Sequence, residues 1–191
     1  VPLNATLGFK ASPVNGLWFN IFGGYRISKD ELFCNLVDAD GYYFTHFLQD
    51  KAKTAYGGAE LKYGYKDWFD ASLKGTFYSW KTDNENEELY LMTKPKFELN
   101  FYAEAKVFEG LKVYWGYEYV QRKEYVIEEG NSSRDFGLGN ISNLSVGASY
   151  TFLKDLSVFG RVNNLLNKQY YYEYGYPAEK LNVLAGLSLV F

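Results

Sequence analysis

The chain has 191 residues, 20% of them aromatic, and a formal net charge of −3 at pH 7. The aromatic content excludes a disordered chain, and the weak negative charge excludes the global basic field that attracts nucleic acid. No apolar run approaches the roughly 18 residues of a transmembrane helix. A single cysteine, Cys34, and a single histidine, His46, exclude an internal disulfide and a two-histidine metal site. We therefore expect no metal site and no nucleic-acid partner.

Apolar and polar residues alternate along most of the chain, which predicts strands and not helices. In residues 96–107 the odd positions are apolar and the even positions are polar or amphipathic, and residues 111–119 repeat the pattern. Counting such segments in chain order predicts nine strands, at residues 3–11, 17–27, 55–65, 69–77, 97–107, 111–119, 144–152, 156–162 and 181–191.

The predicted connections alternate in length. Short ones rich in turn-forming residues lie at 12–16, 66–67, 108–110 and 154–155, and long ones at about 29–51, 83–94, 127–141 and 171–179. Hairpins with all tight turns at one end and all long loops at the other are typical of outer-membrane barrels. Ten residues of about 3.3 Å each, tilted by about 45°, cross an apolar band of roughly 25 Å.

A soluble β-sandwich or lipocalin-like barrel would also alternate, with its apolar face turned inward. Strand length, the one-sided loops and aromatic residues near predicted strand ends favour the membrane. Those aromatic residues are Trp18 and Trp68 beside short turns, and Tyr78 and Trp80 before a long loop.

We therefore predict an all-β fold: an antiparallel transmembrane β-barrel segment with short periplasmic turns and long extracellular loops, in the bacterial outer membrane. Its lipid-facing side chains are expected to include Phe97, Leu99, Phe101, Leu111, Val113, Trp115 and Tyr117.

The sharpest motif begins at residue 156. Val162, Asn164, Leu165 and Tyr170 fit the spacing V-x-N-L-hydrophobic-x-x-x-Y, a Gly-Tyr-Pro loop follows at 175–177, and the last strand ends at Phe191. These features resemble the terminal hairpin of TonB-dependent outer-membrane receptors. Segments 65–77 and 94–100 are similar to receptors of this type from the Bacteroidetes.

The resemblance implies import of a scarce nutrient, such as an iron chelate, a vitamin or a glycan, without a cofactor. Receptors of this family have an N-terminal plug domain and a barrel of about 22 strands. Residues 1–191 are thus expected to be the C-terminal portion of such a barrel, with the plug domain absent. The implied partners are outer-membrane lipid, the remaining barrel and plug polypeptide, TonB acting through the plug, the barrel-assembly machinery and, for some receptors, a surface lipoprotein.

The odd number of predicted antiparallel strands also bears on whether they could close into a barrel. The first and ninth predicted strands run in the same direction, so joining them would make a parallel pair, which bacterial barrels avoid. An unpaired edge in lipid leaves backbone groups unsatisfied. We therefore expect both edges to pair with polypeptide outside these residues.

Two sets of residues have expected roles in this setting. Gly186, Leu187, Leu189 and Phe191 fit a C-terminal signal read by the barrel-assembly machinery, and the alternative is a lipid-facing strand without a recognition role. Aromatic side chains in the outer loops would either stack on a sugar, siderophore or corrin ligand or pack loop against loop. They are Tyr42, Tyr43, Phe44, Phe47, Tyr171, Tyr172, Tyr174 and Tyr176.

The longest predicted loop contains Asp38, Asp40 and His46, which are residue types suited to acid–base catalysis. No nucleophile with matching spacing supports catalysis, and we interpret the segment as the tip of a hairpin running from Phe33 to Phe47.

The acidic run at 83–88 fits no calcium-loop motif and is interpreted as a solvated loop. The primary hypothesis is a transporter and not an enzyme. The alternatives are a small stand-alone barrel with a structural or adhesion role, and an outer-membrane hydrolase.

Overall fold

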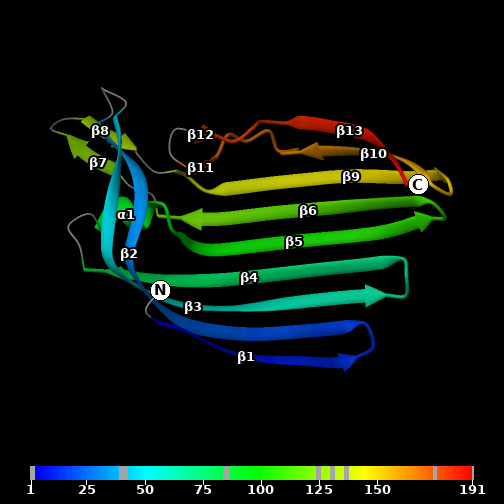
Figure 1. Cartoon of the computed structure of the whole chain (residues 1–191), viewed down its shortest axis with the longest axis horizontal. Coiled ribbons are helices and arrows are strands. Elements are labelled where there is room, and N and C mark those ends of the chain that lie inside the picture. The colour runs from blue at the N-terminus through cyan, green and yellow to red at the C-terminus, as the bar shows by residue number, and fades with distance from the viewer. Residues whose placement is uncertain are drawn as a thin grey trace.

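The computed structural model describes residues 3–38, 43–83, 87–123, 126–129, 132–135, 138–173 and 176–190. Most of them form one nine-stranded antiparallel sheet in the order β1-β2-β3-β4-β5-β6-β9-β10-β13 (Figure 1). Its strands are β1 (Leu3–Val14), β2 (Leu17–Asp38), β3 (Tyr43–Tyr65), β4 (Phe69–Thr82), β5 (Pro95–Phe108), β6 (Leu111–Arg122), β9 (Ile141–Leu153), β10 (Leu156–Asn163) and β13 (Asn182–Leu189).

Each of the nine predicted strands lies in this sheet, so the predicted antiparallel all-β fold is confirmed. Phe33 pairs with Phe47, as the hairpin interpretation of that segment requires. The long connections contain small elements that the alternation did not predict. These are α1 (Glu87–Met92) and the strand pairs β7 (Val126–Glu129) with β8 (Ser132–Asp135) and β11 (Tyr171–Glu173) with β12 (Tyr176–Pro177).

The short and the long connections lie at opposite ends of the sheet, as their predicted lengths require. Figure 1 shows the tight turns of the β1–β2, β3–β4, β5–β6 and β9–β10 hairpins together at one end of the sheet, here the short-turn end. At the other, the long-loop end, lie α1, β7–β8, β11–β12 and the extended part of the β2–β3 hairpin. No helix in the described part of the chain is long and apolar enough to cross a membrane.

The register of the sheet places apolar side chains on one face. Phe101 of β5 lies directly between Leu73 of β4 and Tyr117 of β6, and residues directly opposite each other share a face. That row continues through Leu61, Phe19 and Ala11 on one side and Leu144 on the other. The adjacent row on the opposite face is polar throughout and consists of Lys10, Asn20, Glu60, Lys74, Asn100, Glu118 and Asn143.

The apolar face is exposed. Leu7, Phe9 and Leu187 have exposed fractions of 83%, 62% and 72%. A soluble sandwich or lipocalin-like barrel would bury these side chains, because soluble monomers rarely leave contiguous apolar patches of this extent in water. The two soluble alternatives therefore fit the described residues poorly, and the apolar face requires an apolar environment.

Two clusters of buried side chains lie at the long-loop end. One joins β2, β3 and α1, and the other joins β6, β9 and the segment that precedes β11. Their buried residues are Phe33, Ala52 and Tyr90 in the first, and Val120, Ile141 and Tyr170 in the second. These clusters hold the long connections against the sheet.

The strand-end residues Tyr78 and Trp80 lie on the polar face, so they give no support to an aromatic belt in contact with lipid. Tyr78 lies opposite Tyr56, and both residues continue the polar face. Trp18 lies on that face as well, with the ammonium group of Lys62 5.0 Å from its ring centroid. Closeness to a strand end does not decide which way a side chain points, because the period of two assigns even positions here to the polar face.

Candidate ligand-binding site

The helix α1 packs against the polar face at the long-loop end. Its residues Tyr90 and Met92 are almost fully buried, at 0% and 1% exposed. The Tyr90 ring packs edge-on against Phe33, with ring centroids 5.4 Å apart, and lies 6.3 Å from the ring of Trp80. The helix thereby joins the β2–β3 hairpin to the end of β4.

A change of face in β2 makes this contact possible. Asp30 has a φ of 54°, in the left-handed region. Ser28 on one side of it and Glu31 on the other both reach the polar face, since the Ser28 hydroxyl donates to Glu31 Oε2 at 3.2 Å. Without this kink, the alternation would place Glu31 and Phe33 on the apolar face.

Glu31 is the centre of a polar cluster beside α1. The Tyr90 hydroxyl donates to Glu31 Oε2 at 2.8 Å, and Lys94 Nζ donates to Glu31 Oε1 at 2.5 Å. Burial raises the pKa of Glu31, but hydrogen bonds from Lys94, Tyr90 and Ser28 together with the charge of Lys94 outweigh burial, and the net pKa is lowered. The carboxylate is therefore ionised at neutral pH and holds α1 and Lys94 in place.

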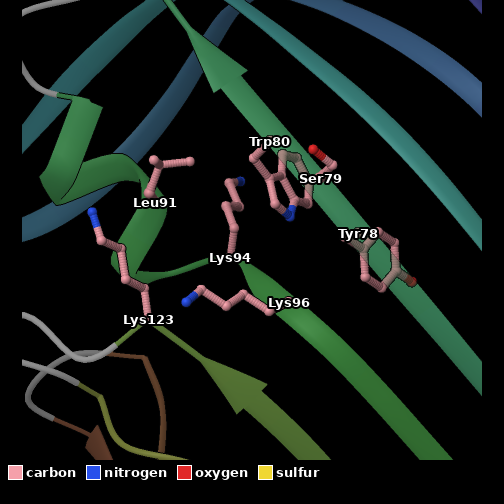
Figure 2. A pocket seen from close by; sticks show the side chains of 7 residues that line it. All are labelled: Tyr78, Ser79, Trp80, Leu91, Lys94, Lys96 and Lys123. Atoms are coloured by element: carbon pink, nitrogen blue, oxygen red, sulfur yellow. The ribbon is translucent and has the colours of Figure 1, made fainter.

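A cavity of about 280 Å³ lies next to this cluster (Figure 2). In this view Lys94 lies between α1 and the Trp80 ring, and Lys96 extends in the direction of Lys123. The lining residues come from β4, α1, β5 and the ends of neighbouring strands, and they are Tyr78, Ser79, Trp80, Leu91, Lys94, Lys96 and Lys123.

The aromatic wall of this cavity is held by hydrogen bonds. The rings of Tyr78 and Trp80 are stacked, with centroids 6.0 Å apart and planes inclined by 24°. The Tyr78 hydroxyl donates to Glu98 Oε2 at 2.8 Å, and Trp80 Nε1 donates to the Pro95 carbonyl at 2.7 Å. The two rings thus present a surface whose orientation is already set.

Among the described residues, charged side chains lie both in the cavity wall and directly behind it. Three lysines line it, and two carboxylates contact the lining side chains: Glu31, which binds Lys94, and Glu98, which accepts from Tyr78. Together, oriented rings and ammonium groups can stack on a flat group and pair with anionic oxygens.

None of the aromatic residues predicted from the outer loops is among the described residues that line this cavity. Tyr172 is 49% exposed and its hydroxyl donates to Glu118 Oε2 at 2.9 Å, and Tyr176 is 71% exposed. Tyr43, Phe44 and Phe47 pair through their backbones in the β2–β3 hairpin, but their side chains, and all of Tyr42 and Tyr174, lie outside the described residues. A ligand-binding role for this set stays a prediction.

The residues that alternation could not single out are Lys94, Lys96 and Lys123. They come from two places in the chain, residues 94–96 and residue 123, and no known motif marks them. The only sequence signal is the pair of lysines that flanks Pro95 at the start of a predicted strand.

The C-terminal motif has a clear structural role. Asn164 is 1% exposed with a φ of 48°. Its Nδ2 donates to the carbonyls of Lys168 and Glu179 at 2.7 and 3.1 Å, and its Oδ1 accepts from Lys168 N at 3.2 Å. This one side chain therefore organises the connection between β10 and β13.

The predicted insertion signal lies in β13. Leu187 and Leu189 lie on the exposed apolar face, and Gly186 is opposite Phe159, whose ring occupies the space that a Cβ would take. Phe191 lies outside the described residues. Recognition by the assembly machinery stays a prediction.

The candidate acid–base residues form no site in the described part of the chain. His46 is exposed and pairs through its backbone with Cys34, Asp38 pairs with Tyr43, and Asp40 lies outside the described residues. Among the residues that the structure describes, no group of three His, Cys, Asp or Glu side chains could hold a metal ion.

The sheet defines the class of fold: an open sector of an outer-membrane β-barrel, with one apolar and one polar face. Solved structures with this fold include the ferripyoverdine receptor of the outer membrane of Pseudomonas aeruginosa. It is 15% identical to this chain, with a TM-score of 0.69, and the match covers 97% of this chain and 26% of the receptor. The ferric enterobactin receptor PfeA of the same species has 16% identity, a TM-score of 0.65 and coverage of 97% and 31%. The ferric-catecholate import receptor Fiu from E. coli K12 has 13% identity, a TM-score of 0.67 and coverage of 98% and 27%.

These similarities confirm the fold that the resemblance implied, that of part of a TonB-dependent receptor barrel. The neighbours are receptors and not enzymes. The chain spans between a quarter and a third of their length. No protein-family model matches the sequence, and a search of curated proteins found no match. The narrower resemblance to Bacteroidetes receptors has no support among these structures.

The Glu31 cluster predicts a specific loss when the carboxylate is removed. Glu31→Gln should lower the local stability of α1 by about 1–3 kcal/mol, because Lys94 and Tyr90 lose a charged acceptor. Hydrogen exchange of the Thr93 and Lys94 amides, which donate to the carbonyls of Tyr90 and Leu91, measures this opening. Equal exchange in both proteins would contradict the role of Glu31.

The stabilisation of α1 by Glu31 should depend on pH in a known direction. Since the pKa of Glu31 is lowered from its ordinary 4.5, its stabilisation is complete above that value and is lost as pH falls through the lower pKa of the folded protein. Glu31→Gln should show no such loss. Glu104→Gln is the matched control, because Glu104 binds Lys112 at 2.7 Å and does not contact α1.

Proposed function

We propose that this chain is the C-terminal portion of a TonB-dependent receptor barrel, residues 1–191, that takes part in importing a scarce nutrient across the bacterial outer membrane. One observation carries the proposal: across all nine strands, the sheet has an exposed apolar face and an opposite polar face. Such a sheet needs lipid on one side and water or protein on the other.

The register supports lipid contact for the predicted residues. Leu99, Phe101 and Ala103 of β5 pair with Tyr119, Tyr117 and Trp115 of β6. Phe97, Leu111 and Val113 continue the same face, as their odd positions in these strands require. A shift of one residue in β5 would turn Glu98 and Glu104 into hydrocarbon, so the lipid face sets the register.

The open edges support further polypeptide as a partner. In the described residues β1 pairs only with β2, and β13 only with β10. In lipid, the unpaired backbone groups of each edge would cost several kcal/mol apiece. The proposed partners are therefore the remaining barrel strands on the two edges, and a plug domain against the polar face through which TonB acts. Assembly machinery and a surface lipoprotein belong to the same proposal.

Transport is favoured over the two alternatives. The structural neighbours are receptors for ferric chelates by their own descriptions. A stand-alone barrel would need β1 to pair with β13, and hydrolysis would need a catalytic group around His46. Neither alternative has a specific observation in its favour within the described residues. A ferric chelate, a vitamin and a glycan all remain candidate nutrients.

Lipid contact can be tested at two adjacent positions. Phe101→Arg should destabilise the membrane-inserted protein by about 2–4 kcal/mol if the residue lies near the bilayer midplane, and Asn100→Arg much less, because only Phe101 points to the apolar face. Denaturant unfolding in phospholipid bilayers measures both. Spin labels at the same positions should differ in their accessibility to a lipid-soluble quencher, and equal accessibility would overturn the membrane assignment.

Transport can be tested in the bacterium that carries the gene. Deleting the gene that encodes this chain should abolish high-affinity uptake of one nutrient from a panel of radiolabelled ferric chelates, cobalamin and oligosaccharides. Loss of TonB should have the same effect, because the family couples import to TonB. Unchanged uptake of the entire panel in the deletion strain would contradict a role in transport.

A further inference from the structure

Four lysines interrupt the apolar face of the sheet at its long-loop end. They are Lys29 of β2, Lys51 and Lys53 of β3, and Lys81 of β4. The register joins them into two cross-strand pairs, because Lys29 lies directly opposite Lys51 and Lys53 directly opposite Lys81. Residues from three adjacent strands therefore form one basic cluster.

The burial of neighbouring residues fixes the face on which this cluster lies. Ala52 is 0% exposed and packs with Tyr90 of α1 on the polar face, and Thr54 is 3% exposed. Lys51 and Lys53 alternate with these buried residues, so their side chains point to the opposite, apolar face. The lysines of β2 and β4 share that face, because residues directly opposite each other lie on the same side of a sheet.

The depth of the cluster corresponds to the far boundary of the apolar band. Lys29 lies twelve positions from Leu17, and Lys81 twelve positions from Phe69, each counted from the first strand residue after a short turn. Twelve residues of about 3.3 Å, tilted by about 45°, rise roughly 28 Å, slightly more than the apolar band of roughly 25 Å. The ammonium groups are therefore at the level of lipid headgroups on the long-loop side of the membrane.

The described residues neutralise this charge only in part. The ion pair that the cluster makes there joins Lys53 Nζ to Asp83 Oδ2 at 3.5 Å, and the Asp83 side chain is 60% exposed. Asp30 and Asp50 are exposed and lie next to the cluster in the chain, but among the described residues neither forms an ion pair with it. Three of the four ammonium groups thus have no carboxylate partner in the part of the chain that the structure describes.

The two lysine pairs are unfavourable without an anion between them. Like charges directly opposite in an antiparallel pair destabilise a sheet, whereas a phosphate group between two ammonium groups would pair with both. On the same face, toward the short-turn end, β2 presents Tyr25 and Ile21, which are 39% and 57% exposed. A molecule that satisfies both parts of this surface has phosphate at one end and acyl chains at the other.

We propose that the four lysines bind the headgroup of a bisphosphorylated lipid in the outer leaflet, with one phosphate at each lysine pair and the acyl chains along the apolar face below. The lipid would hold β2, β3 and β4 together from the outside, opposite the side on which α1 packs. The inference goes beyond transport, since it depends on the placement of the sheet in the membrane and not on the nutrient.

The test compares two lipids that share their acyl chains and differ in phosphate. The protein, with all the polypeptide that its gene encodes, is placed in phosphatidylcholine bilayers that contain a trace of spin-labelled lipid A. The lipid A carries both of its phosphates or has had both removed. The fraction of label immobilised at the protein surface gives the relative affinity. The phosphorylated form should be immobilised to a larger extent, and added salt should weaken this preference.

Matched variants locate the contact. Lys29→Gln combined with Lys81→Gln removes one ammonium group from each pair, and should weaken binding of the phosphorylated lipid by roughly 10- to 30-fold without affecting the phosphate-free lipid. Lys29→Arg combined with Lys81→Arg should keep most of the affinity, which excludes misfolding as the cause. The controls are Lys74→Gln on the polar face of β4 and Lys154→Gln in the short turn between β9 and β10, and both should leave the preference unchanged.

Each other result would overturn the lipid site. Equal immobilisation of the two lipids, or a full preference in the double Gln variant, would do so directly. Displacement of the phosphorylated lipid by millimolar inorganic phosphate at constant ionic strength would indicate a site for the free anion instead. Cross-links between carboxyl and amine groups that join Lys29 or Lys51 to the acidic run at 83–88 would show that the chain neutralises its own lysines.

These outcomes are separate from the proposed function. If the lipid site fails while the gene deletion still abolishes uptake of one nutrient, the transport function stands. Equal accessibility of positions 100 and 101 to the lipid-soluble quencher would overturn the membrane placement and the lipid site together.

Discussion

The structure depends on one constraint: in hydrocarbon, every backbone N–H and C=O needs a partner within the protein. In β4, β5 and β6 the strands meet this constraint by pairing along most of their length on both sides. Pairing fixes the period of two, and the period sorts the side chains into an apolar and a polar face. The tight turns, the long loops and the open edges follow from the same requirement.

The candidate site lies at the long-loop end, where the backbone is no longer required to pair along its whole length. There the kink at Asp30 turns Glu31 and Phe33 to the polar face. There α1 finds an apolar partner in Phe33 and a charged one in Glu31. A rigid sheet therefore supplies Tyr78 and Trp80, and a short connection supplies Lys94. Recognition groups on a scaffold of this kind are held with little loss of entropy on binding.

Alternation in the sequence was sufficient to predict the nine strands, their antiparallel order and the faces of β5 and β6, because a strand with two different environments must alternate. It could not predict α1, which has six residues and is stabilised by tertiary contacts of Tyr90 and Met92 more than by local preference. Tyr78 and Trp80 were used as strand-end aromatic residues in favour of a membrane, but their even positions place both side chains on the polar face. The positive φ of Asp30 has no signal in the pattern, so the partners of Glu31 were beyond sequence reasoning.

The central claim is that these strands are one sector of a larger barrel. Photo-cross-linking from Leu7 in β1 and Leu187 in β13 of the membrane-inserted protein tests it directly, because both side chains lie at the two edges on the exposed face. Besides the known neighbours in β2 and β10, mass spectrometry should identify peptides from polypeptide outside residues 1–191. Cross-links that join Leu7 directly to β13 would show a closed nine-stranded barrel and contradict the account.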